Sequence, residues 1–292
     1  MSWRTVCITT RAKLEHSLGY LVVRSETTTR IHLSEISLLI IDTPMAAITS
    51  SLMIELVKNK IKVVLCDEKH NPTAELMDQY GSVDSSLRIR EQIAWTPENK
   101  RRIWTEIVRE KITRQQDLLL RSEHTEAADL LLRYLAELQP NDVSNREGHA
   151  AKVYFNALFG KSFSREQDCP TNSALNYGYS LLLSCFNKEI TGKGYLTQLG
   201  IFHDNQFNPF NLASDLMEPF RPLVDGKVLS MQFREFGKEE KAALLNLLND
   251  EVLLAGNRQR VTQAISIYVD RALQALGLGQ QEQLVFYACI AS

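Results

Sequence analysis

One short stretch of the sequence, residues 200–222, concentrates side chains that could hold a metal ion. It reads GIFHDNQFNPFNLASDLMEPFRP and contains His203, Asp204, Asp215 and Glu218. Asp215 and Glu218 are three residues apart, so both carboxylates project from one face if LASDLMEP is helical. One imidazole and a carboxylate pair make a partial metal site, which another part of the chain must complete.

Glu147 is the upstream carboxylate that could complete this site. The quartet Ser144 to Glu147 fits an S-x-x-E capping box, in which the glutamate only reaches back to the N-cap amide. Two features favour a further role. Gly148 stands in the first turn, where glycine costs on the order of 1 kcal/mol relative to alanine. The following HAAKVYFNALFG has apolar residues at helical spacing, which places Glu147 near the inner side of a helix ending at Gly160.

Two carboxylates with one imidazole form an oxygen-dominated donor set. Such a set suits Mg²⁺ or Mn²⁺ better than structural zinc, although it does not exclude zinc. The five cysteines form no C-x-x-C pair and are odd in number, which argues against a thiolate zinc site and suits a reducing cytoplasm. No nucleophile elbow or Cys/His pairing supplies an activated serine or cysteine.

Composition sets the broad class. The 292 residues are 44% hydrophobic and 23% charged, which is typical of a soluble protein with one large or two medium domains. No signal-peptide pattern and no run of eighteen apolar residues favours secretion or membrane insertion. The net charge of −2 excludes a generic basic protein that coats nucleic acid, so a polyanion must be met by local basic patches.

The residue patterns predict an α+β fold, with a small N-terminal β-rich domain followed by a larger all-α domain. Residues 1–75 contain the strand-like runs TVCIT, YLVVRS, RIHLSEISLLIID and IKVVLCD, with a short helix capped by Ser50 or Ser51. Residues 76–95 are interpreted as a linker. Helices are expected in residues 96–292, among them a central buried helix from Thr171 to Asn187. The apolar tail QLVFYACIAS is expected to form a last strand on this protein, or a strand added to a partner's sheet.

Several of these segments together resemble a known family. NREGHAAKVYFNALFG, LNYGYSLLLS, GIFHDNQFNPFNLASDLMEPFRPLVD and SWRTV with HLSEIS closely resemble the DNA integrase of CRISPR adaptation, the first-numbered Cas protein, in its type II branch. The resemblance implies that residues 1–75 form a dimerisation domain and residues 96–292 a catalytic, metal- and DNA-binding domain. It also implies a prokaryotic cytoplasmic endonuclease and integrase of antiviral defence, which inserts short DNA fragments as spacers at the leader end of a CRISPR array.

The resemblance also implies partners and ligands. Two homodimers flank a central dimer of a small second adaptation subunit, forming a heterohexamer, and other type II CRISPR proteins are further candidate partners. The substrates are double-stranded DNA fragments and the repeat and leader DNA. Glu147, His203 and Glu218 fall on the family's catalytic triad, which binds Mg²⁺ or Mn²⁺, and Asp215 has a supporting role. Whether His203 is only a ligand or also a general base stays open.

DNA-contacting residues are predicted from their positions. Arg146, Lys152 and Arg221 lie beside the triad in sequence and are candidates for phosphate contacts, although Arg221 could equally form an ion pair within the turn EPFRP. Arg11 and Lys13 are expected in the loop after the first strand, where they could contact DNA. Two alternatives to the integrase remain: a catalytically silent DNA-binding scaffold, in which Glu147 only caps its helix, and a nuclease acting on branched repair intermediates.

Overall fold

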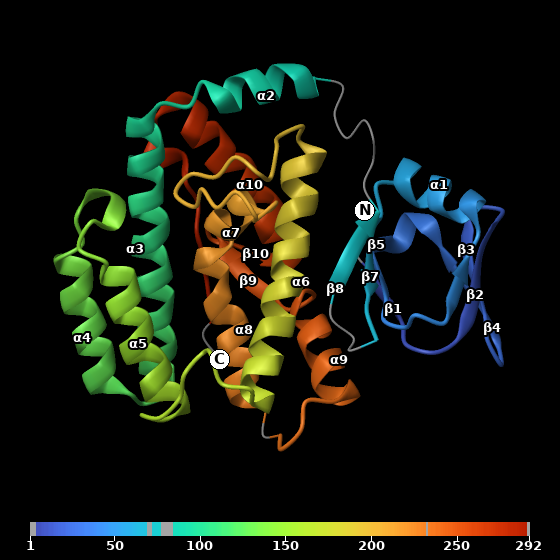
Figure 1. Ribbon diagram of the computed structural model, residues 1–292, viewed down its shortest axis with the longest axis horizontal. Coiled ribbons are helices and arrows are strands. Elements are labelled where there is room, and N and C mark those ends of the chain that lie inside the picture. Colours follow the sequence, from blue (N-terminus) through green and yellow to red (C-terminus); the bar gives the residue numbers. More distant parts are fainter. Residues whose placement is uncertain (1–3, 69–71, 77–83, 232, 291–292) are drawn as a thin grey trace. The chain divides into compact units, whose positions relative to one another are not determined.

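The computed structural model describes residues 4–68, 72–76, 84–231 and 233–290. The chain divides into two compact units, Met1–Gly81 and Ser82–Ser292. Strands and one α-helix build the first unit, whereas the second is mainly helical (Figure 1), so the expected α+β class is confirmed. The division falls inside the segment 76–95 that was interpreted as a linker. Helix α2 (Ser85–Ile93) occupies the later part of that segment, which the sequence patterns did not predict.

Two four-stranded sheets share the core of the N-terminal unit (Figure 1), with the orders β1-β5-β7-β8 and β4-β3-β2-β6. The elements are β1 (Arg4–Ile8), β2 (Ala12–Ser17), β3 (Tyr20–Arg24), β4 (Thr28–His32), η1 (Leu33–Glu35), β5 (Ile36–Ile41), β6 (Ala46–Ile48), α1 (Ser50–Lys58), β7 (Lys62–Cys66) and β8 (Pro72–Leu76). β5 runs parallel to both β1 and β7, whereas β3 is antiparallel to β2 and β4. Leu14, Leu39 and Leu52 are fully buried and join the sheets to α1.

Three details of this unit correct the expectations. Lys13 lies in strand β2 rather than in a loop, because Ala12 and Leu14 are buried while Lys13 is exposed, the alternation of a half-buried strand. Arg11 does lie in the loop. The run HLSEISLLI is not one strand, since the 3₁₀ turn η1 separates β4 from β5. Helix α1 is capped by Thr49 instead of serine, because the Thr49 hydroxyl accepts a hydrogen bond from the amide of Leu52 at 3.3 Å.

Helices dominate the second unit. After α2 come α3 (Pro97–Arg121), α4 (Thr125–Ala136), η2 (Pro140–Asp142), α5 (Arg146–Phe159), α6 (Pro170–Gly192), α7 (Asn211–Leu216), η3 (Glu218–Phe220), α8 (Arg221–Ser230), α9 (Lys238–Leu247), β9 (Glu251–Leu254), β10 (Asn257–Arg260), α10 (Val261–Leu278), η4 (Gln281–Gln283) and β11 (Tyr287–Ala288). α4 and α5 pack on α3, and α8 lies between α3 and α6 (Figure 1).

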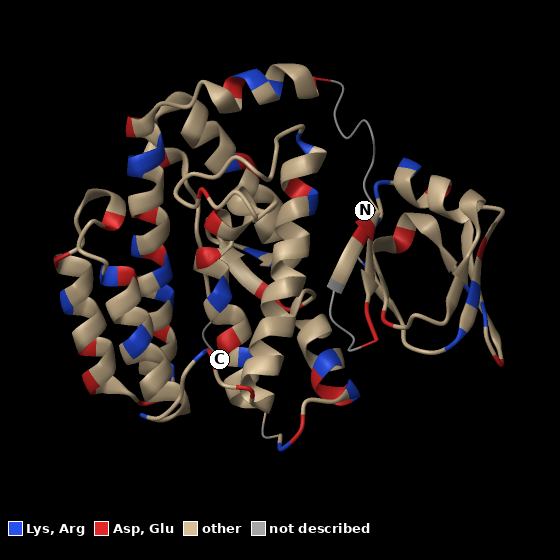
Figure 2. Cartoon of the chain, viewed as in Figure 1, with Lys and Arg blue, Asp and Glu red and all other residues tan. Residues whose placement is uncertain are grey.

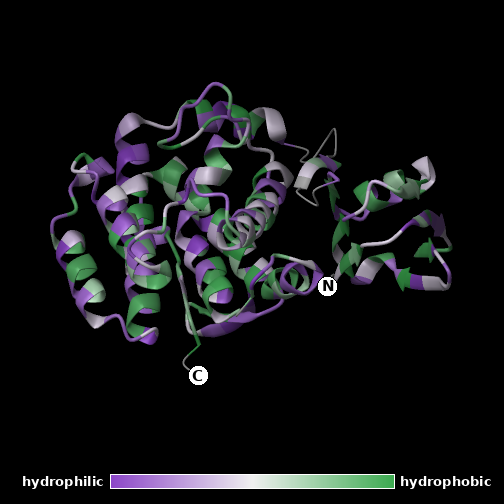
Figure 3. Ribbon diagram, turned by 60° about the horizontal axis from the view of Figure 1, so that its bottom comes forward, coloured by the Kyte–Doolittle hydropathy of each residue, from purple (hydrophilic) through white to green (hydrophobic). Residues whose placement is uncertain are grey.

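Buried aromatic residues fill the centre of the helical unit. Phe186 of α6, Phe220 of η3 and Tyr268 of α10 are fully buried, and their ring centroids lie 5.4–6.1 Å apart. Hydrophobic and hydrophilic residues alternate around the helices in Figure 3, and both signs of charge line their outer faces in Figure 2. α6 is the central buried helix that was expected, although it begins at Pro170 and continues to Gly192. Among the residues placed by the structure, no helix has the length and apolar character needed to span a membrane.

The C-terminal tail folds back into this unit. β11 pairs antiparallel with β9, which confirms the expected last strand on this protein and adds it to a three-stranded sheet of order β10-β9-β11. Tyr287 is only 1% exposed. Its ring lies 4.8 Å from that of Phe220 and under the guanidinium of Arg114 at 5.6 Å. The tail therefore supports η3, the turn on which Glu218 stands.

Candidate active site

Glu147 lies at the start of α5, but it does not cap the helix. The Asp142 carboxylate accepts hydrogen bonds from the amides of Arg146 at 2.7 Å and Glu147 at 2.9 Å. Asn145 is left-handed, with φ 53°, which leaves Ser144 outside the first turn. The capping-box interpretation is therefore wrong, and Asp142 satisfies the helix terminus. The Glu147 side chain instead extends inward to another charged group.

Glu218, the first residue of η3, is 4% exposed and pairs with two cations. Its Oε1 lies 2.9 Å from Nε of Arg221, and its Oε2 lies 2.5 Å from Nζ of Lys111. Burial acts to raise the pKa of Glu218, but Arg221 and Lys111 outweigh it, so this pKa lies below its ordinary value. The short contact between Oε2 and the Lys111 ammonium is a charge-assisted hydrogen bond as well as an ion pair.

Lys111 of α3 is the residue that sequence reasoning missed. Its Nζ lies 2.5 Å from Glu147 Oε1 as well as 2.5 Å from Glu218 Oε2, and its side chain is 10% exposed. Burial acts to lower the pKa of Lys111, but these two carboxylates raise it above its ordinary value. A signal was present: Lys111 follows Ile103 and Ile107 at four-residue intervals, so it interrupts the apolar inner face of the helix.

His203 is fixed by Asp215, which is fully buried in α7. The Asp215 carboxylate accepts hydrogen bonds from the amides of Ile201, Phe202 and His203 at 2.6–3.2 Å. It also lies 2.5 Å from Nδ1 of His203. This hydrogen bond is the main reason that the pKa of His203 is raised above its ordinary value, and Glu218 and Glu147 contribute to the same shift. With Nδ1–H donated to Asp215, Nε2 is the nitrogen left to bind a cation or accept a proton.

The loop that carries His203 needs glycine at position 200. A Cβ added to Gly200 would lie 2.2 Å from the carbonyl oxygen of His203 and 2.9 Å from Asp215 Oδ2. Phe202 stacks on the buried Trp104 with ring centroids 4.6 Å apart, and the His203 ring stands edge-on to the same indole at 5.9 Å. Backbone, carboxylate and aromatic contacts thus fix the imidazole from three sides.

The structure brings Glu147 and Glu218 together through Lys111, and it pairs His203 with Asp215. Among the residues it describes, no three His, Cys, Asp or Glu side chains are close enough in this arrangement to hold a metal ion together. The chemistry of these residues nevertheless fits a hard divalent cation. The two carboxylates already converge on one positive nitrogen, and carboxylate oxygens are the ligands that such a cation prefers.

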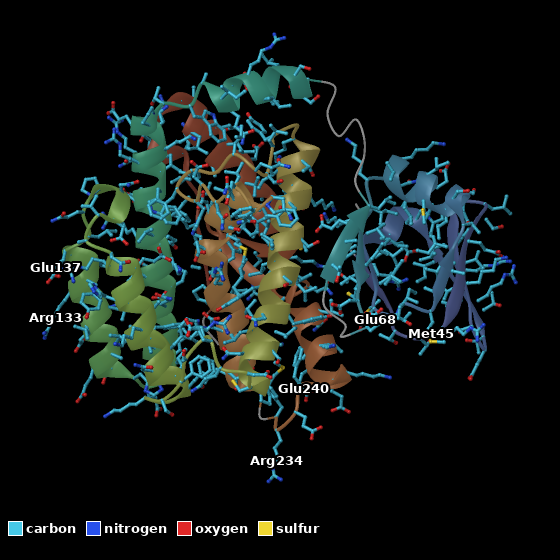
Figure 4. All side chains as sticks on the ribbon, in the orientation of Figure 1. Met45, Glu68, Arg133, Glu137, Arg234 and Glu240 are labelled. Atoms are coloured by element: carbon cyan, nitrogen blue, oxygen red, sulfur yellow. The ribbon has the colours of Figure 1, made fainter. Side chains whose placement is uncertain are left out.

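The predicted DNA contacts in the helical unit have different surroundings. Arg221 forms the expected ion pair with Glu218. Arg146 pairs with Glu137, labelled in Figure 4, at 3.0 Å. Lys152 is exposed on α5, and Asp204 is exposed in the loop after His203. These positions leave Lys152 open to solvent, whereas the two arginines are already engaged with carboxylates.

Arg11 and Lys13 lie in the N-terminal unit, whereas Glu147, Lys111 and Glu218 lie in the helical unit. Both are exposed, and Lys13 pairs with Glu15 at 3.2 Å. With Arg24 they line an open groove of about 840 Å³. Their proposed contact with DNA stays a prediction.

A second cavity adjoins Arg221, which contacts Glu218. It has a volume of about 310 Å³ and is lined by polar side chains that include Arg165, Asn176, Tyr179, Ser180, Ser214 and Arg221. The guanidinium groups of Arg165 and Arg221 lie 5.3 and 4.6 Å from the ring centroid of Tyr179. Two fixed positive charges and the hydroxyl groups of Ser180 and Ser214 suit an anionic group such as a phosphodiester. Because Arg221 also contacts Glu218, this cavity and the carboxylate cluster share one side chain.

Asp225 forms a buried polar centre behind this cavity. Its carboxylate accepts hydrogen bonds from the hydroxyls of Tyr154 at 2.8 Å and Tyr179 at 2.5 Å, and the residue is 1% exposed. The Tyr179 hydroxyl is thus satisfied within the protein, as a buried tyrosine requires. Burial raises the pKa of Asp225 from 3.8 to about 6.

This raised pKa makes stability depend on pH. The folded chain holds a proton that the unfolded chain has lost, so the contribution of Asp225 is present below pH 4 and is lost as pH rises through about 6. A shift of two pKa units corresponds to about 3 kcal/mol. Part of this is already lost at pH 4, so relative to wild type Asp225→Asn is expected to gain about 2 kcal/mol of unfolding free energy between pH 4 and pH 7. Urea unfolding across this range measures it, and parallel curves for the two proteins would contradict it.

The comparisons with known proteins identify the family of this chain. The family model for CRISPR associated protein Cas1 matches residues 6–252. The chain belongs to the Cas1 family. It is 33% identical over 233 residues to the CRISPR-associated endonuclease Cas1 of Neisseria meningitidis serogroup C (strain 8013), which covers 79% of this chain and 76% of that protein. It is 31% identical over 170 residues to a CRISPR-associated endonuclease Cas1 of Thermus thermophilus, covering 48% of this chain and 54% of that protein.

Solved structures show the same fold. A Cas1 protein from Thermotoga maritima has a TM-score of 0.75 at 16% identity, covering 99% of this chain and 100% of that one. A casposase bound to an integration product has a TM-score of 0.78 at 19% identity, covering 96% and 92%. A chain of a Cas6-RT-Cas1–Cas2 complex has a TM-score of 0.71 at 17% identity, covering 96% of this Cas1 and 36% of that longer chain. At these identities the likeness establishes the fold.

Proposed function

We propose that this Cas1 integrates short DNA fragments into a CRISPR array by metal-dependent transesterification. The observation that supports the proposal best is the convergence of Glu147 and Glu218 on one cation position, beside an imidazole whose Nδ1 is fixed by Asp215. Glu147, Glu218 and Nε2 of His203 would hold Mg²⁺ or Mn²⁺. When bound, the ion would supply a Lewis acid for the scissile phosphodiester.

The reaction is a phosphodiester exchange. The 3′-hydroxyl of the fragment attacks the phosphorus of a repeat phosphodiester, the bond from that phosphorus to the repeat's 3′-oxygen breaks, and the departing oxygen takes up a proton. Nε2 of His203 is held in place for ligation or for accepting the proton of the attacking hydroxyl, because Asp215 occupies Nδ1. Arg221, on the Glu218 carboxylate and beside the small cavity, is placed to balance negative charge next to the reacting phosphate.

Neighbours in structure support part of the proposed assembly. The similar chain of the Cas6-RT-Cas1–Cas2 complex supports a Cas2-type small subunit as partner, and the casposase bound to an integration product supports DNA as substrate. We propose a homodimer formed through the N-terminal unit, with two dimers flanking the small subunits, in the cytoplasm of a prokaryote. Bands at the mass of two Cas1 dimers plus one dimer of the small subunit in native mass spectrometry would support this stoichiometry, and a lone Cas1 monomer would contradict it.

A joining assay tests the function. The protein and its small subunit are incubated with a short duplex bearing free 3′-hydroxyls and a supercoiled plasmid carrying a repeat array, in Mg²⁺, Mn²⁺ or chelator. Metal-dependent covalent joining of the duplex to the plasmid is expected, and joining in chelator would contradict the metal requirement. Because the curated relatives are named endonucleases, branched DNA is tested in parallel. Cleavage of branched DNA without joining would favour the repair nuclease instead.

The small cavity is expected to contribute to DNA binding. The Arg165 guanidinium is oriented by the side-chain oxygens of Asn172 and Asn176, which fixes its charge at the cavity wall. Arg165→Ala is expected to weaken DNA binding about tenfold, because a charge-assisted phosphate contact is worth roughly 1.5–3 kcal/mol. Fluorescence anisotropy with labelled duplex measures this, with Arg133→Ala on α4 as a surface control. Equal affinities for the two variants would exclude the cavity as a phosphate site.

A further inference from the structure

Lys111 stands where the proposed function needs a metal ion. Its ammonium is 2.5 Å from one oxygen of Glu147 and 2.5 Å from one oxygen of Glu218, the two carboxylates that would hold the divalent cation. Arg221, the other cation of this cluster, binds the opposite oxygen of Glu218. Arg221 can therefore stay in place when a metal ion binds, whereas Lys111 cannot keep both of its contacts.

The charges around Lys111 explain why a cation is needed there. The Lys111 and Glu218 side chains are 10% and 5% exposed, so the charge of Glu218 would be poorly solvated without a partner. Arg221 offsets one of the two negative charges, so removing Lys111 leaves a second carboxylate charge uncompensated, which is unfavourable in a poorly solvated site. The ammonium thus serves as an internal counterion that keeps two like-charged carboxylates close together while no metal ion is bound.

We propose that Lys111 and the divalent cation exchange places in the working site. When the ion binds Glu147 and Glu218, the Lys111 ammonium leaves the gap between them and donates to an oxygen of the DNA phosphate at the reacting centre. A lysine side chain suits this movement, because it carries a compact charge on a flexible four-carbon stem. The inference rests on the proposed metal-dependent function and adds a positioning residue to it.

The exchange predicts coupling between metal and DNA. Without DNA, the displaced ammonium has lost both carboxylates and has gained no anion, so the metal ion binds weakly. With DNA present, a phosphate oxygen receives the ammonium, and the metal ion binds more tightly. By linkage, the metal ion must strengthen DNA binding by the same factor.

Calorimetric titration with Mn²⁺ tests the exchange, using wild type, Lys111→Met and a control. Lys111→Met is expected to bind Mn²⁺ at least about tenfold more tightly than wild type without DNA, since close buried charge pairs couple by more than that factor. A short duplex should strengthen Mn²⁺ binding to wild type and do so less in the variant. The control is Lys193→Met, because Lys193 pairs with Asp270 at 3.1 Å and not with a carboxylate of this cluster. This control should bind Mn²⁺ as wild type does.

Thermal melting distinguishes the proposed exchange of Lys111 with the metal ion from a purely structural role of Lys111. In chelator, the melting temperature of Lys111→Met should lie below that of wild type. Saturating Mn²⁺ should remove this difference, because the ion replaces the missing ammonium. Lys111→Gln serves as a second variant that keeps a polar group if the methionine variant does not fold. Unchanged or weaker Mn²⁺ binding in the folded variant overturns the exchange while leaving the proposed function intact. Absence of Mn²⁺ binding in wild type and variant alike overturns both.

Discussion

Glu147→Gln and His203→Ala are expected to reduce metal-dependent DNA joining by about a thousandfold or more, with the helical unit still folded. Each substitution removes a group that acts on the reacting centre, and loss of one electrostatic stabiliser there already lowers rates by about 10²–10³. The fold should persist, because the two side chains are 25% and 43% exposed and leave no large cavity. The joining assay in Mg²⁺ or Mn²⁺ measures the loss, and melting curves check the fold.

Glu137→Gln is the matched control for these variants. Glu137 lies at the end of α4, its side chain is 54% exposed, and it pairs with Arg146 outside the carboxylate cluster. This variant should join DNA at nearly the wild-type rate. Joining that survives in both Glu147→Gln and His203→Ala would remove the integrase proposal and return the scaffold alternative.

Tyr287→Ala is expected to destabilise the helical unit by about 3–5 kcal/mol, the range for removing a large buried aromatic side chain. Tyr287 is 1% exposed and packs between Phe220 and Arg114, so its loss leaves a cavity under η3. At this size of unit, the melting temperature should fall by roughly 10 °C. Because Phe220 lies two residues from Glu218, joining activity should fall at temperatures where the protein is still folded.

Leu278→Ala is the control for the tail, because Leu278 at the end of α10 is 64% exposed. Its melting temperature should match wild type. Deletion of residues 284–292 should have a larger effect than Tyr287→Ala, since it also removes the pairing of β11 with β9. A stabilising role of the tail within this chain is therefore expected instead of the alternative, in which the tail adds a strand to a partner's sheet. A deletion that melts with wild type and loses only assembly with the small subunit would restore that role.

Sequence patterns predicted the structure correctly where a single physical property, such as the apolar surface of a helix, determined it. The buried α6 follows from its apolar surface. The expected single helix with Asp215 and Glu218 on one face is wrong, because α7 ends at Leu216 and Glu218 begins the separate turn η3. The sequence predicted that Asp215 supports the site. Its hydrogen bonds to three amides could not be predicted from residue spacing, because they depend on the close approach of the loop at Gly200. The caps of the helices were less predictable. The backbone of Asn145 is left-handed, so the carboxylate of Asp142, and not the hydroxyl of Ser144, accepts the amide hydrogen bonds at the start of α5.

The missing part of the site was a cation. Sequence reasoning searched for ligands of opposite charge to a metal ion, so it collected carboxylates and an imidazole. Lys111 is separated from Glu147 and Glu218 by helices and loops, and only tertiary packing of α3 against α5 and η3 brings it between them. The signal in the sequence was a single charged residue, Lys111, on the apolar face of a long helix. Its role could not be inferred without knowing that Glu147 and Glu218 lie next to it.

The order of these elements along the chain affects when the centre can form during synthesis. Lys111 and Glu147 leave the ribosome first, His203 and Glu218 later, and Tyr287, which supports η3, after all of them. Domains fold as units once their chain is available. A nascent chain that has not yet reached β11 therefore lacks the packing that fixes Glu218, and the complete centre forms only after Tyr287 has emerged. This late assembly restricts the proposed chemistry to chains that contain β11.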